Sequence, residues 1–520
     1  MGHRPRRHAG IGGVLLLLAS SAAACGGGGT DGGSGSGDAV RYGFDFELNL
    51  SDTFDPQQSL STCDRLALEW IYGTLTTLDE SGAPQPGLAE SWEIDDDAGT
   101  MTLTLRDGLE FSDGTPFDAE AVAAGLEYLK TGEQVSEGLT AMASAEAVDA
   151  TTVQINLDGP GFSLPYNLAG REGMIPAPST YDIDDPDAGT ATTDPIGAGP
   201  FAFVEFSPGE RIVLERNEGY GGPESYDFDT LQLTQVGVGN PAVTALAAGE
   251  VDVIGYEAES QSVIDEDSSL SSDSRVGEVY AQIQLRLDEP FDDVRIRQAM
   301  NYAIDRQEYI DVVQNGIGEV AWMPYPEASP NYNPEVAGVY QQDLDRAREL
   351  LAEAGVPDGF EFDMAIPGGV TGQERQAELL QAQLAEVGIV ANIVPLGTDI
   401  ATEYYLQRAA DAFSAARPAS PNPVGQVNDQ WAEFAFVAIH NDAERPDLTD
   451  LVHQAEAAAT DEERAEIMQE AMAIIVEDAL EVPIAFTPRN VAWSNERIDG
   501  EIGGPAEICD PVDLQGISLR

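Results

Sequence analysis

The chain has 520 residues, of which 92 are acidic and 25 basic, so its formal net charge at pH 7 is −67. A surface this negative repels nucleic acids and anionic lipid headgroups, which excludes both as partners. The hydrophobic content of 42% is typical of a globular chain, and the length favours more than one domain.

The first 24 residues have the layout of a secretory signal peptide: a positively charged tip, a short apolar run and small residues. The run is too short to span a membrane, and no later segment approaches 18 consecutive apolar residues. Three alanines precede Cys25, as in a bacterial lipobox, so we expect Cys25 to be lipidated. A plain signal peptide with an incidental cysteine is the alternative. The glycine-rich residues 25–38 predict a flexible tether.

Two cysteines are left if Cys25 carries lipid. Cys63 and Cys509 would lie in an oxidising compartment, where a disulfide between them is the expected state. Such a bridge would tie the start of the mature chain to its end. The alternative is two unpaired buried thiols.

Helical and strand patterns alternate along the chain. Residues 244–254 ("TALAAGEVDVI") and 374–396 each read as a helix, a glycine and a strand. Apolar residues at helical spacing predict a helix within 292–313, with Asp292 or Asp293 as its N-cap, and another in "DLDRARELLAEAG", ended by Gly355. Interleaved helices and strands indicate an α/β fold.

Motifs of known catalytic chemistry are absent from the sequence. It contains no H-E-x-x-H, G-x-S-x-G or C-x-x-C, and its only lysine, Lys130, is not in a Walker A loop. His440 and His453 are too far apart in sequence to suggest a metal pair. The acidic run at residues 95–97 is expected by chance in so acidic a chain. We therefore expect neither an enzyme nor a cofactor.

Six short stretches, taken in order, match one family pattern: residues 52–59, 71–122, 194–203, 216–220, 292–306 and 343–355. They include "DTFDPQQS", "DPIGAGPFAF", "RNEGY" and "DDVRIRQAMNYAIDR". Each is weak alone, but the ordered series resembles the extracellular solute-binding proteins of family 5. These are the peptide- and nickel-type receptors of bacterial ABC importers.

The resemblance implies a bilobed, periplasmic-binding-protein-like α/β fold, with two mixed-sheet lobes joined by a hinge and a small inserted domain. Both termini would lie in lobe I, so Cys63 and Cys509 would share a lobe. The expected bounds are 39–75, 195–285 and 485–520 for lobe I, 76–194 for the inserted domain and 286–484 for lobe II.

The implied function is a monomeric, non-catalytic receptor on the outer face of the cytoplasmic membrane, attached only by its lipid. It would deliver peptides or similar small solutes to an ABC permease. An oligosaccharide or metal chelate is the alternative solute, and a secreted acidic hydrolase is the alternative of another class.

The site is expected near residues 413–431. Peptide-binding members often carry there a "W...D..DP"-type loop whose carboxylate receives the peptide ammonium. Here Arg417 stands near the aromatic position, and no acid lies between it and Pro423. An arginine in the cleft suggests an anionic group on the solute, whereas pairing with a local acid is the alternative. The candidate ligand-binding residues are Glu47, Thr62, Arg171, Trp322, Tyr325, Arg417, Asn422 and Trp431.

Overall fold

A computed structural model of the chain divides it into two units, Met1–Gly37 and Asp38–Arg520. The hydrophobic clusters of the described residues all lie in the second unit. Cys25, Cys63 and Cys509 fall outside the described residues, as do Glu47 and Thr62. The structure describes residues 39–44, 53–59, 65–79, 82–132, 135–185, 189–237, 240–256, 258–368, 371–397, 404, 407–418, 420, 422–432, 445–458, 460–503 and 512–520.

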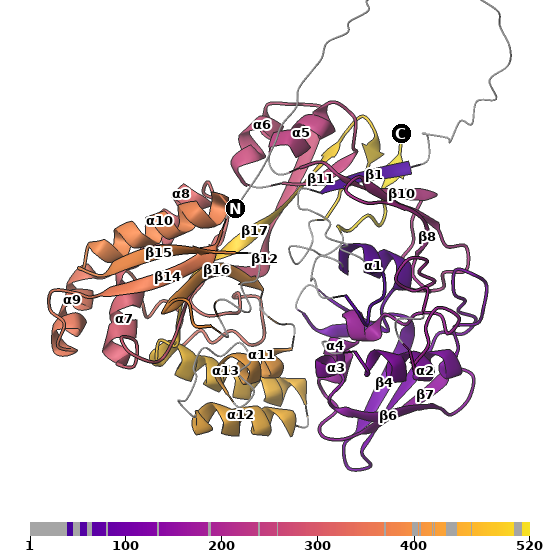
Figure 1. Cartoon of the computed structure of the whole chain (residues 1–520), viewed down its shortest axis with the longest axis horizontal. Helices are drawn as coiled ribbons and strands as arrows, with labels where there is room; N and C mark the ends of the chain where they lie inside the picture. The colour runs from indigo at the N-terminus through magenta and orange to yellow at the C-terminus, as the bar shows by residue number, and fades with distance from the viewer. Residues whose placement is uncertain are drawn as a thin grey trace, which may run out of the picture. The chain divides into compact units, whose positions relative to one another are not determined.

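A mixed sheet of 11 strands organises the second unit (Figure 1). The two-residue strand β13 (Glu319–Val320) pairs with β17 beside the main path. The other strands, in spatial order, are β15 (Val390–Leu396), β14 (Glu361–Pro367), β16 (Ala412–Pro418), β12 (Leu270–Leu285), β17 (Glu481–Ser494), β11 (Val253–Gly255), β1 (Ala39–Phe44), β10 (Thr230–Gln235), β9 (Arg211–Arg216) and β8 (Phe201–Ser207).

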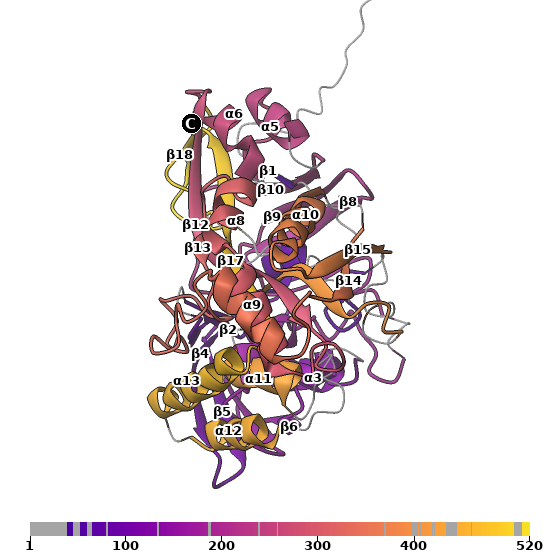
Figure 2. The same cartoon turned by 90° about the vertical axis from the view of Figure 1, so that its left-hand side faces the viewer.

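The long antiparallel strands β12 and β17 link the two halves of this sheet (Figure 2). Their register shifts between Val276 and Tyr280. Before the shift, β17 continues into β11 and β1, and after it β12 continues into β16 and β14. The two strands are therefore the direct covalent and hydrogen-bonded connection between two separately packed halves.

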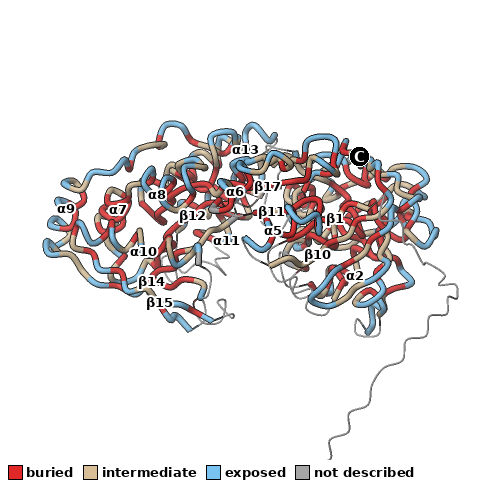
Figure 3. Tube along the Cα trace, turned by 90° about the horizontal axis from the view of Figure 1, so that it is seen from above, coloured by how far each residue is buried: buried red, intermediate tan, exposed pale blue. Residues whose placement is uncertain are grey.

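Each half has its own core, and the buried residues concentrate on its strands (Figure 3). The core of the β1 half is aromatic-rich and packs α1 (Arg65–Tyr72) on the strands, and a smaller cluster beside it packs α5 (Asn240–Ala247) and α6 (Gln261–Asp265). In the β14 half, α7 (Val294–Ala303), α8 (Arg306–Val313), α9 (Leu344–Glu353) and α10 (Thr371–Ala385) cover the sheet. A separate cluster joins α11 (Pro423–Trp431), α12 (Pro446–Glu456) and α13 (Asp461–Glu477).

A smaller antiparallel sheet with a core of its own lies between β1 and β8 in the sequence. Phe111 is buried in this core and Trp92 packs against it. The elements of this region are β2 (Thr76–Leu78), β3 (Pro84–Pro86), β4 (Ala89–Asp95), β5 (Thr100–Leu105), α2 (Ala119–Leu129), α3 (Val135–Gly138), β6 (Met142–Ala147), β7 (Thr152–Leu157), α4 (Leu164–Asn167) and a 3-10 turn at Arg171–Gly173. A second 3-10 turn, Ala258–Ser260, follows later in the chain. Near the C-terminus, β18 (Ile498–Asp499) pairs with β19 (Ser518–Leu519).

Local sequence signals explain several boundaries. Asp343 caps α9 by accepting from the Arg346 amide at 2.9 Å, and Gly355 follows with φ 91°, as a helix C-terminus requires. The α10–Gly388–β15 and α5–Gly249–β11 units are also confirmed. One expectation is corrected: the apolar pattern within 292–313 forms two helices, because Ile304 and Asp305 are extended and the Asp305 carboxylate caps α8.

The mixed α/β architecture is thus confirmed. The lobe and inserted-domain boundaries stay a prediction. None of the helices in the described part of the chain is long and apolar enough to cross a bilayer.

Candidate functional site

Arg417 lies near the end of β16, Asn422 directly precedes α11, and Tyr325 is linked to Arg417 through side chains of α11. Trp431, the fourth candidate of this region, is the last residue of α11. The Asn422 side chain accepts from the Gly425 amide at 3.1 Å, and Pro423 occupies the first helical position. The structure therefore gives Asn422 a capping role, which positions α11 directly after the strand that carries Arg417.

Two buried glutamines on α11 connect Tyr325 with Arg417. The Tyr325 hydroxyl donates to Gln426 Oε1 at 2.8 Å. With its amide oxygen assigned toward Arg417, Gln430 accepts from Arg417 Nε at 3.1 Å, from Arg417 Nη2 at 3.3 Å and from Gln426 Nε2 at 3.2 Å. This orientation satisfies both amides, so a continuous hydrogen-bonded chain fixes one edge of the Arg417 guanidinium.

Arg417 is half-buried and lies opposite Tyr280 in the β12–β16 ladder. No carboxylate among the described residues forms an ion pair with it. Pairing with a local acid, the alternative weighed for this arginine, is therefore not found within the described part of the chain. Among the described residues, its charge has no carboxylate partner.

The two tryptophans differ in their surroundings. Trp431 is only 3% exposed and packs within the apolar α11–α13 cluster. Its ring therefore supports the packing of these helices and is not exposed for contact with a solute. Trp322 is half-buried, and the Arg306 guanidinium carbon lies 5.1 Å from its ring centroid. Trp322 also lines a small pocket.

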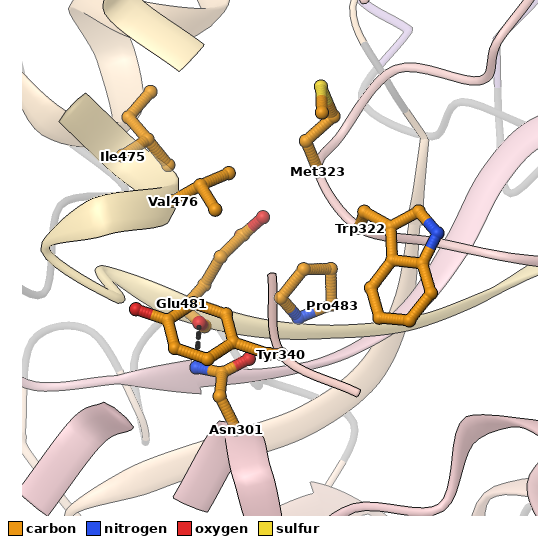
Figure 4. A pocket seen from close by; sticks show the side chains of 8 residues that line it. All are labelled: Asn301, Trp322, Met323, Tyr340, Ile475, Val476, Glu481 and Pro483. Atoms are coloured by element: carbon orange, nitrogen blue, oxygen red, sulfur yellow. Dashed lines mark hydrogen bonds between the residues drawn. The ribbon is translucent and has the colours of Figure 1, made fainter. Parts of the chain in front are cut away.

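That pocket lies between β17, α13 and the segment after β13, and has space for about one water molecule (Figure 4). Apolar side chains and the ring of Tyr340 enclose the carboxyl group of Glu481. The Asn301 amide donates to the Glu481 backbone oxygen at 3.0 Å. The lining residues are Asn301, Trp322, Met323, Tyr340, Ile475, Val476, Glu481 and Pro483.

Glu481 is a buried acid that sequence reasoning missed. Burial raises the pKa of its carboxyl to about 7, and the Tyr280 hydroxyl and the charge of Arg417 oppose that rise. Tyr280 is fully buried and donates to the two carboxyl oxygens at 3.2 and 3.1 Å. As one acid among 92, Glu481 carries no sequence signal that distinguishes it.

Arg171 belongs to a different part of the molecule. It begins the 3-10 turn Arg171–Gly173 and donates to the backbone oxygen of Ser59. No contact between described residues joins it to the α11 network. Within the described part of the chain, no group of three or more metal-ligating side chains is close enough to hold an ion.

Comparison with known proteins shows which family the chain resembles in sequence. The sequence profile of the bacterial extracellular solute-binding proteins, family 5 Middle, matches residues 83–433. The glutathione-binding protein GsiB of Escherichia coli (strain K12) is 28% identical over 357 residues, 66% of this chain and 67% of that protein. Heme-binding protein A of Haemophilus influenzae is 30% identical over 346 residues, 60% and 61% of the two chains. The chain thus spans about two thirds or less of these relatives.

Solved structures agree on the fold. NikA from Brucella suis, in complex with Fe(III)-EDTA, superposes with a TM-score of 0.81 at 22% identity, covering 92% of this chain and 100% of that one. The periplasmic binding protein DppA from Helicobacter pylori, in complex with peptide STSA, gives 0.76 at 23% identity, covering 92% and 98%. The bilobed binding-protein fold predicted from the sequence is confirmed. Because the profile covers more than half of its residues, the chain belongs to the bacterial extracellular solute-binding proteins of family 5.

Proposed function

We propose that this protein is a lipid-anchored, extracytoplasmic receptor that delivers small peptides or similar solutes to an ABC import permease and performs no chemistry itself. The observation that carries the proposal is the family match over residues 83–433. It is supported by relatives that bind glutathione or heme and by a structural neighbour that holds a peptide.

The membrane attachment in this proposal rests on the leader. Residues 1–24 would be removed, Cys25 would carry the lipid, and residues 25–38 would let the receptor move near its permease. A short flexible tether raises the local concentration at the permease to roughly millimolar. The same proposal includes a monomeric state, a Cys63–Cys509 bridge, and a lobe I formed by residues 39–75, 195–285 and 485–520.

The solute would lie between the lobes and contact the half-buried Arg417, which the buried Tyr325 supports through the α11 glutamines. Lobe closure excludes water and strengthens polar contacts to the solute. A metal chelate is the second candidate solute, because a structural neighbour binds Fe(III)-EDTA. An oligosaccharide is a third, and the panel below separates them.

A thermal-shift screen of the chain from Asp38 tests the proposal. The panel holds di- to pentapeptides, glutathione, heme, oligosaccharides and nickel or iron chelates, each in high and low salt. A solute at 100 times its dissociation constant adds about 2.7 kcal/mol, which raises the melting temperature by a few degrees. A shift with peptides supports the proposal, a shift only with sugars or chelates replaces the solute, and no shift with any compound counts against the receptor function.

A further inference from the structure

The guanidinium of Arg417 is built into the site as a fixed cation. Gln430, which is 4% exposed, accepts from Nε and Nη2, and the Gln426–Tyr325 hydrogen bond holds the amide chain in place. A neutral amide thus positions one edge of the guanidinium without cancelling its charge. An arginine has five N–H donors, and the N–H groups of Arg417 that do not face Gln430 form no hydrogen bond with another described residue.

The lack of a carboxylate partner is notable in so acidic a chain. Two other half-buried arginines, Arg41 and Arg497, share the buried carboxylate of Asp252. The acid whose charge is felt at Arg417 is Glu481, but it makes no ion pair with the guanidinium. Its carboxyl group accepts from Tyr280 instead, inside the small pocket beside α13.

Burial therefore prevents Glu481 from competing for Arg417. With its pKa raised to about 7, the carboxyl group is largely neutral in mildly acidic solution. Among the described neighbours, burial raises the pKa of Tyr280 and of Tyr340, so both are uncharged near neutral pH. The donors of Arg306 are occupied by backbone and Asn301 oxygens. A half-buried guanidinium that is held in one orientation and has no carboxylate partner among the described residues can bind a carboxylate through paired hydrogen bonds.

We propose that Arg417 is the anion-binding residue of the solute site, with Gln430 as its positioning residue, and that the transported solute carries a carboxylate. The proposal rests on the receptor function proposed above, and it identifies the chemical class of the solute.

The first test needs no identified solute. In the chain from Asp38 labelled with ¹⁵N-arginine, the Nε–H signal of Arg417 is assigned by its loss in Arg417→Gln. Sodium acetate should move this signal saturably, whereas acetamide and sodium chloride at equal ionic strength should not. Gln430→Glu, which places an isosteric carboxylate beside the guanidinium, should abolish the response. No acetate response, an equal response to chloride, or an undiminished response in Gln430→Glu would each overturn the proposal.

The second test uses tri-alanine and its C-terminal amide. Losing a charge-assisted hydrogen-bonded pair should weaken binding of the free acid roughly 10- to 100-fold in Arg417→Gln. Arg346→Gln makes the same charge change on an exposed, ion-paired site of α9 and should leave affinity unchanged. Equal binding of acid and amide by the wild-type chain would overturn the carboxylate subsite while leaving the receptor function intact. If tri-alanine does not bind, the acetate titration alone decides the subsite, and the solute panel decides the receptor function.

Discussion

Replacing Glu481 by glutamine should stabilise the protein at alkaline pH and have little effect at acidic pH. The glutamine keeps the shape of the side chain and can still accept from Tyr280, but it cannot ionise. The folded-state pKa of Glu481, about 7, lies above its ordinary value of 4.5, so ionisation opposes folding. The stability that protonated Glu481 contributes to the folded state is fully present below pH 4.5, and it is lost as the pH rises through 7 and the carboxyl group ionises.

The size of the effect follows from the difference between the two pKa values. Complete ionisation of Glu481 in the folded state costs about 3 kcal/mol relative to the unfolded chain. Glu481→Gln should therefore raise the free energy of unfolding by up to about 3 kcal/mol at pH 8, relative to its effect at pH 4.

Urea unfolding of the chain from Asp38, at both pH values, measures this difference. The whole chain is strongly anionic, so absolute stability varies with pH for many reasons, and only the difference between variant and wild type is informative. Glu477→Gln removes the same charge from an exposed position near the end of α13 and serves as the control. A pH-independent difference for Glu481→Gln, or an equal pH dependence for Glu477→Gln, would refute the reasoning.

Three further substitutions, one of them with a matched control, test the packing. Asp252→Asn should lower the free energy of unfolding by about 3–5 kcal/mol in denaturant titrations, because Arg41 would lose a fully buried carboxylate; a loss below 1 kcal/mol would contradict this. Gly388→Ala should cost at least about 1 kcal/mol, since φ is 89° and a Cβ would lie 2.9 Å from a backbone oxygen, whereas Gly372→Ala, in open space on a helix, should be neutral or stabilising. Phe162→Ala should cost about 3 kcal/mol, because the ring is 9% exposed and lies 4.4 Å from a buried guanidinium carbon; an unchanged unfolding midpoint would show that this contact contributes nothing.

Local signals in the sequence predicted much of the fold. The glycines after α5, α9 and α10 and the capping role of Asp293 required only the pattern of neighbouring residues. The break between α7 and α8 was missed because Ile304 continues the apolar spacing of the helix. The competing signal was Asp305, three residues before Glu308, which caps the second helix.

The site was less predictable, because its contacts join distant segments. Arg417 was a candidate from the sequence, where it was expected in a loop, but it lies on strand β16, and its anchoring by Gln430 depends on the orientation of α11. The link to Tyr325 crosses 101 residues of sequence to Gln426. Glu481 could not be distinguished among so many acids, since burial in a strand, rather than residue type, raises its pKa.

Isothermal titration calorimetry with a compound that raises the melting temperature tests the central claim most directly. A receptor without chemistry should release heat that saturates at one solute per chain and then falls to the heat of dilution. Sustained heat flow after saturation would reveal turnover of the solute and contradict the account, as would the absence of saturable binding by every member of the panel.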